Sequence, residues 1–216
     1  MFGPWRIGPG KEEGFIRFIT ITNFDLTLRE LTPNLAPLTV GWFLGPAAAG
    51  LLALVQRVTL LLQQPAVLLS QASYVVLARQ AARREFVALR STVWRAAAIA
   101  GLIATPVVFV LTVMGGRVLT LVGGAAFSGG GTLLVIVAIS RMAALGTTPI
   151  AAGLTALGRP QRSLIVGLGT NLGLYPLLPL LIGLMGVNGA GWHALIQTFI
   201  GFAVLAAFFF SDSLKN

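Results

Sequence analysis

Three arginines, Arg29, Arg57 and Arg141, lie within long apolar stretches of this 216-residue chain, where a charged side chain is costly to place. Arg29 has Asp25 and Glu30 beside it for a local ion pair, whereas Arg57 and Arg141 have no such neighbours. Arg57 and Arg141 each follow the start of such a stretch by nine or ten residues, which is roughly 15 Å along a helix. A guanidinium group presents its donors as a fork that matches the oxygens of a phosphate or diphosphate. Two arginines at matching depth therefore predict a shared polar cavity for an anion.

Polar residues recur seven positions after each arginine, which is two helical turns and hence one helical face. The two sets are Arg57, Gln64 and Gln71, and Arg141, Thr148 and Thr155. The residues expected to bind substrate are Arg57, Arg141, Gln64, Gln71 and Thr148. The alternative is that each arginine pairs with a carboxylate or a helix carbonyl, although Glu85 is the sole acid between positions 47 and 157.

Composition identifies the elements that carry these residues as membrane helices. Hydrophobic residues make up 56% of the chain, charged residues 10%, and the mean hydropathy is +0.88. Apolar stretches longer than about 18 residues can cross a bilayer core of roughly 30 Å. The sequence predicts an all-α integral membrane helix bundle of about six spans, over Phe24–Leu44, Ala47–Leu77, Ser91–Met114, Thr132–Leu157, Ser163–Met185 and Gly189–Phe210. Residues 1–23 are expected to form a leader, 24–210 the membrane domain and 211–216 a tail.

The positions of the basic residues predict an orientation. With six spans, eleven of the fifteen lysines and arginines fall on one side and Arg117 on the other. Short loops rich in lysine and arginine remain in the cytoplasm, so both termini are expected there. Contact of these loops with anionic membrane lipids accounts for the net charge of +9, and no nucleic-acid partner is expected.

Several kinds of chemistry find no support in the sequence. Without cysteine and with one histidine, the chain is expected to hold no metal and no cofactor. Gly10–Lys11 does not fit a nucleotide-binding loop, and no catalytic set is evident, so an enzyme is not expected. His193 is expected in the aromatic interfacial belt beside Trp192, and Asn171, Tyr175 and Gln197 in hydrogen bonds between helices. Prolines that permit bends in five of the six spans are Pro33, Pro37, Pro65, Pro106, Pro149, Pro176 and Pro179.

Four short motifs, in order, resemble those of the C-terminal half of polysaccharide and O-antigen flippases. They cover roughly residues 31 to 210 and share that family's spacing and topology. The motifs are Leu44–Gly50 ("LGP-x-x-x-G"), Gly115–Phe127 ("L-x-x-G-x-x-F"), Thr155–Pro160 ("A-x-G-R-x") and Gly186–Ala190 ("G-x-x-G-A"). The family's acidic residue followed by arginine is replaced here by Asn34–Pro37, so the resemblance gives no support for ion coupling through that helix.

The resemblance implies a place in one lobe of a two-lobed transporter in the bacterial cytoplasmic (inner) membrane. Such a protein would flip a polyprenyl-diphosphate-linked oligosaccharide by alternating access, for lipopolysaccharide or polysaccharide biosynthesis. Because the chain matches half of the family's helices, the expected protein partner is a missing N-terminal half or a second copy of itself. The alternatives are a truncated or non-transporting membrane scaffold and a membrane-embedded lipid-modifying enzyme.

Overall fold

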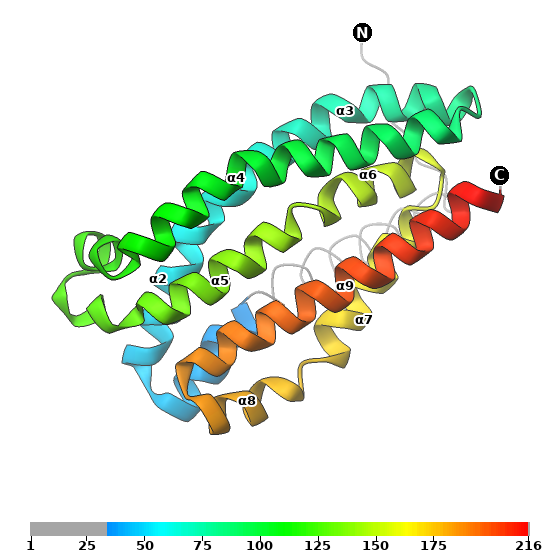
Figure 1. The fold of residues 1–216 in the computed structure, drawn as a ribbon. Helices are drawn as coiled ribbons and strands as arrows, with labels where there is room; N and C mark the ends of the chain where they lie inside the picture. Colours follow the sequence, from blue (N-terminus) through cyan, green and yellow to red (C-terminus); the bar gives the residue numbers. More distant parts are fainter. Residues whose placement is uncertain (1–33, 216) are drawn as a thin grey trace, which may run out of the picture. The chain divides into compact units, whose positions relative to one another are not determined.

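The computed structural model describes residues 34–215, which form helices and short turns with no strand among them. Residues Pro37–Asn216 make one compact unit. A helix over residues 34–44 is followed by ten elements (Figure 1). They are α2 (Pro46–Leu60), η1 (Leu61–Gln63), α3 (Gln64–Ala82), α4 (Phe86–Gly123), η2 (Ala125–Gly130), α5 (Gly131–Ala144), α6 (Thr147–Ala156), α7 (Pro160–Gly173), α8 (Leu177–Met185) and α9 (Val187–Lys215).

Within the described residues, four helical stretches are long and apolar enough to cross a membrane, and the bent pair α7–α8 would make a fifth. They are Pro46–Ala82, Phe86–Gly123, Ala125–Ala156, Val187–Ser213 and the pair Gln161–Gly173 with Leu177–Met185. These stretches overlap five of the predicted spans, which confirms an all-helical architecture for residues 34–215, with helices long and apolar enough to span a membrane. The remaining predicted span, Phe24–Leu44, lies outside the described residues up to position 33, as does the predicted leader.

Prolines account for three breaks within these stretches. A proline has no N–H for the carbonyl four residues earlier, and it is tolerated in the first turn of a helix. Pro65 follows the 3₁₀ turn η1, Pro149 lies in the first turn of α6, and Pro176 immediately precedes α8, where the path bends by 48°. Pro106 lies inside α4, which continues through it.

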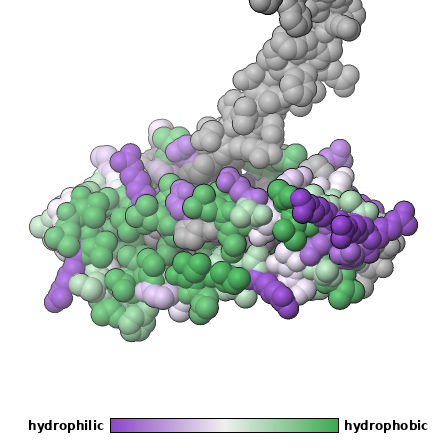
Figure 2. Space-filling model, turned by 90° about the horizontal axis from the view of Figure 1, so that it is seen from above, coloured by the Kyte–Doolittle hydropathy of each residue, from purple (hydrophilic) through white to green (hydrophobic). Residues whose placement is uncertain are grey.

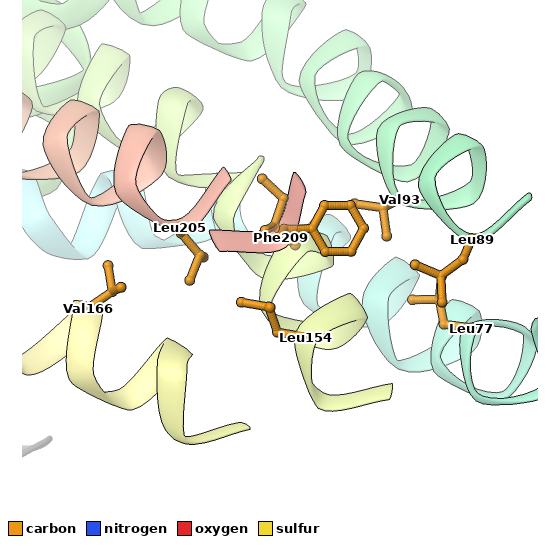
Figure 3. Close-up of a cluster of buried hydrophobic side chains, with 8 residues drawn as sticks. Leu77, Leu89, Val93, Leu154, Val166, Leu205 and Phe209 are labelled. Atoms are coloured by element: carbon orange, nitrogen blue, oxygen red, sulfur yellow. The ribbon is translucent and has the colours of Figure 1, made fainter. Parts of the chain in front are cut away.

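The stretch Ala125–Ala156, which contains α5 and α6, is more enclosed than the other three single stretches. In its most apolar part, 50% is buried inside the protein, against 11% for Val187–Ser213. It packs against α2, α3, α4 and α9. At the end where α3 meets α4, a cluster of apolar side chains joins α3, α4, α6, α7 and α9 (Figure 3). Its members are Leu77, Leu89, Val93, Ile150, Leu154, Val166, Leu205 and Phe209.

The outward surface of the helices is apolar, the reverse of a water-soluble bundle. On α4 the inward face carries small residues such as Ala96, Ala100 and Ala104, which let neighbouring helices approach closely. The outward face exposes large apolar side chains, among them Leu102, Phe109 and Val113. Figure 2 shows a broad hydrophobic surface of this kind, with hydrophilic residues gathered toward one end. Such a surface suits the hydrocarbon core of a membrane.

Candidate functional site

The two predicted arginines occupy equivalent places in the fold. Arg57 lies in the last turn of α2 and Arg141 in the last turn of α5, and each of these helices stops partway through a span. The C-terminal end of a helix carries a partial negative charge, which favours a cation there. The breaks at η1 and at Leu145–Gly146 therefore lower the cost of an arginine within the span.

Arg141 is fixed by a neighbouring span. Its Nη1 donates a hydrogen bond to Oε1 of Gln63 over 3.3 Å, and its side chain is partly buried. Gln63 is residue 18 of 37 in Pro46–Ala82, and Arg141 is residue 17 of 32 in Ala125–Ala156, counted from the bounds of the two stretches. Both residues thus lie at the middle of their spans, and the structure holds a positive charge there against a neutral amide.

Carboxylates are remote from this arginine within the described part of the chain. Residues 34–215 contain two acids, Glu85 in the turn between α3 and α4, and Asp212 near the end of α9. Both lie near one end of the spans, and Asp212 is engaged by Arg159 and Arg162. Within residues 34–215, the predicted alternative of a carboxylate partner for Arg141 is therefore not met.

The other predicted binding residues differ in exposure. Arg57 is exposed, six residues before Gln63 and hence about 9 Å along the helix axis. Gln64 and Gln71 are also exposed, and Thr148 is partly buried in α6. The seven-residue spacing did not identify Gln63, because η1 turns by about 120° per residue and shifts the face that a continuous α-helix would present. Their assignment as substrate-binding residues stays a prediction.

A second group of polar residues joins α9 to α7 and α5. The Nε2 atom of His193 lies 3.0 Å from the Leu174 carbonyl, at the bend between α7 and α8. Gln197 donates a hydrogen bond to Asn171, and Ser140 Oγ lies 3.0 Å from Thr198 Oγ1. The expected hydrogen bond between helices is confirmed for Asn171 and Gln197, and Tyr175 likewise bonds Thr39 on the helix over residues 34–44. The His193 side chain is buried against the protein, whereas Trp192 is exposed, and the interfacial position expected for His193 stays a prediction.

A charged cluster that the sequence did not predict lies where α6, α7 and α9 meet. The carboxylate of Asp212 accepts hydrogen bonds from Arg159 and, over 2.5 Å, from Arg162, whose guanidinium also lies 5.2 Å from the ring centre of Phe208. Asp212 was expected in the tail over residues 211–216, but α9 continues through Lys215 and buries it. The sequence signal was available, since Asp212 is the sole acid after Glu85.

No family model, curated protein or solved structure matches this chain. In the described residues, no three histidine, cysteine, aspartate or glutamate side chains are grouped so that they could hold a metal ion. The geometry of Arg141, Gln63 and the span breaks is thus the basis on which a function can be argued.

Proposed function

We propose that this chain is one lobe of a membrane transporter that flips a polyprenyl-diphosphate-linked oligosaccharide across the bacterial cytoplasmic membrane. The observation that carries the proposal is the partly buried Arg141 at the middle of its span, hydrogen bonded to neutral Gln63 and without a carboxylate partner in residues 34–215. A positive charge at this depth favours an anionic ligand, and a diphosphate suits the two-pronged guanidinium.

The broken spans support transport. Helices interrupted near the membrane midplane are typical of secondary transporters, whose substrates bind where the helix ends meet. Here α2 ends before η1, α5 ends before Gly146, and α7 and α8 are inclined at 48°. Interruptions of this kind permit a span to bend, which a transporter that opens alternately to the two sides of a membrane would use.

The exposed polar residues on α2 and α3 support the proposal that a second lobe packs against this chain. Arg57, Gln64 and Gln71 are exposed on this chain and lie within a span. An arginine facing lipid at the centre of a span costs about 2.5–3.5 kcal/mol on insertion scales. A six-span lobe that pairs with a first half, or with a second copy, would cover these residues and enclose the diphosphate between Arg57 and Arg141.

A non-transporting scaffold is the second candidate, and the Arg141–Gln63 hydrogen bond favours it in one respect. An arginine already held by a glutamine and by the end of α5 can serve to fix two spans without any ligand. The two candidates predict different effects of replacing Arg57 and Arg141. If the chain is a scaffold, the protein becomes less stable. If it is a transporter, the flux of substrate falls.

The test is transport of a labelled polyprenyl-diphosphate sugar in proteoliposomes that contain the full chain. The proposal predicts flux above that of protein-free liposomes, and a loss of at least about tenfold in the variant Arg57→Ala/Arg141→Ala, equal to 1.4 kcal/mol of binding. Arg117→Ala is the matched control, because Arg117 lies near the C-terminal end of α4. The flux through this variant should equal that of the parent protein. Equal flux in the double variant and in Arg117→Ala would reject the two arginines as the diphosphate site. No flux in the parent protein would reject a transporter built from two copies of this chain.

A further inference from the structure

The turn between α3 and α4 gathers exposed arginines at one end of the spans. Arg79, Arg83, Arg84 and Arg95 are exposed and Arg90 is partly buried, with Glu85 as the acid among them. The hydrophilic end of the surface in Figure 2 corresponds to the end where α3 meets α4 and where α9 finishes. The ion pairs found at this end of the described chain use Arg159, Arg162 and Asp212, so they do not neutralise the arginines of this turn.

Nearby aromatic residues indicate the depth of this turn. Trp94 stacks on Phe210 with ring centres 5.9 Å apart and meets Phe202 edge-on at 6.3 Å, a cluster suited to the membrane–water boundary. Gln80 Nε2 donates a hydrogen bond to Thr92 Oγ1 over 3.0 Å. Gln80 of α3 therefore lies at about the same height along the spans as Trp94 of α4, two residues after Thr92. α3 ends at Ala82, about 3 Å beyond Gln80 along the helix axis, and Arg83 and Arg84 follow in the turn. The headgroup layer on each side of a bilayer is roughly 5–8 Å thick, so with Trp94 at the boundary the arginines of the turn would fall within this layer.

Arg84 adopts a backbone conformation that usually belongs to glycine. Its φ is 59°, and the turn has the hydrogen bonds of a Schellman cap, Glu85 N to Gln80 O at 2.9 Å and Arg84 N to Ala81 O at 3.0 Å. The turn after α6 has the same pattern, with Gly158 at φ 75° in the equivalent place. The cap requires a left-handed residue at this position, so the unusual feature is that an arginine rather than a glycine occupies it, and a residue kept at a strained position points to a functional use of its side chain.

We infer that the α3–α4 turn is a binding site for anionic phospholipid headgroups. The arginines at the headgroup level supply guanidinium donors for lipid phosphates, and each basic residue near an anionic surface strengthens attachment appreciably. Arginine in place of glycine at this left-handed position adds an exposed guanidinium to the turn. This site lies at one end of the spans, away from Arg141, and does not depend on any transported substrate.

The experiment uses the full chain with one introduced cysteine, Ser91→Cys, on exposed Ser91 of α4. Because the chain has no cysteine of its own, a fluorescent donor attaches at that position alone. In phosphatidylcholine vesicles, energy transfer is compared between acceptor-labelled phosphatidylglycerol and acceptor-labelled phosphatidylcholine at equal density. We expect phosphatidylglycerol to be enriched around the donor by at least about fivefold, the factor expected from one arginine near an anionic surface. Arg117→Gln, at the other end of α4, should keep this enrichment.

The variant Arg84→Gly separates a lipid site from a purely structural turn. Glycine relieves the backbone strain, so the unfolding midpoint in phosphatidylcholine should rise by roughly 2–4 °C while the phosphatidylglycerol enrichment falls by at least about twofold. Equal energy transfer from the two lipids in the parent protein would overturn the inference. An unchanged enrichment in Arg84→Gly would overturn it as well. Neither result concerns transport, so this inference and the transporter proposal can fail separately.

Discussion

Arg57 and Arg141 are related by position: each stands three residues before the last residue of a helix, Leu60 in α2 and Ala144 in α5, that stops within a span. The two differ in surroundings, because Arg141 is partly buried against Gln63 whereas Arg57 is exposed. Arg141 is thus positioned by this chain alone, and Arg57 is available to a neighbouring lobe.

Gln63→Leu should destabilise the protein more than Gln64→Leu. The first change leaves the Arg141 guanidinium without its amide partner, and hydrogen bonds to charged groups contribute about 1.5–3 kcal/mol. Gln64 is exposed and serves as the matched control. Unfolding in mixed detergent gives the difference in free energy, and equal destabilisation of the two variants would mean that the Gln63 bond does not hold Arg141.

Asp212 and Arg162 should show a coupling energy of about 1 kcal/mol in a double-mutant cycle of Asp212→Asn and Arg162→Gln. The carboxylate side chain is 1% exposed and the arginine side chain 34%, so water reaches one partner and weakens the interaction. Arg117→Gln, combined with Asp212→Asn, is the distant control and should be additive. Additivity in the Arg162 cycle would show that this ion pair does not join α7 to α9.

Gly189→Ala should destabilise the protein by about 3 kcal/mol or more. A Cβ atom on Gly189 would lie 2.1 Å from the Leu181 carbonyl oxygen, and a backbone atom of α8 cannot move aside cheaply. Gly183→Ala is the control, since nothing lies within 4 Å of its Cβ position and alanine favours the helix. A normal yield and unfolding midpoint for Gly189→Ala would contradict the close packing of α8 on α9.

The basic end of the spans should face the cytoplasm. Ala82→Cys at that end and Ser128→Cys at the other are both exposed, and each would be the sole cysteine of its variant. In intact cells a membrane-impermeant maleimide should label Ser128→Cys, and it should label Ala82→Cys after permeabilisation. The reverse pattern would place the arginines outside and contradict the positive-inside orientation.

Hydropathy was sufficient to predict five helical stretches, because a span is an average over some twenty residues that single substitutions hardly alter. The breaks within them depend on local chemistry. Every proline leaves the carbonyl four residues earlier without its usual donor, yet α-helices begin or end near Pro65, Pro149 and Pro176, whereas α4 continues through Pro106. A proline alone therefore did not tell a broken helix from a continuous one.

The candidate site was predicted in part. Arg141 was identified from its charge within an apolar stretch, but its partner was not, since η1 shifts the register and brings Gln63 rather than Gln64 toward α5. The Arg162–Asp212 pair joins residues fifty positions apart, and no spacing rule within one helix reveals such a contact. Local periodicity predicts which residues share one face of a helix. Contacts between helices depend on how the helices pack, which the periodicity of a single helix does not give.

The most direct test of the central claim is equilibrium binding of a fluorescent polyprenyl diphosphate to the full chain in detergent micelles. We predict saturable binding that weakens at least about tenfold in Arg141→Gln, through loss of a charge-assisted pair, and that is unchanged in Arg117→Gln. Circular dichroism and the unfolding midpoint confirm that each variant remains folded. Equal affinity of parent and Arg141→Gln protein would contradict the assignment of Arg141 as the group that holds the diphosphate.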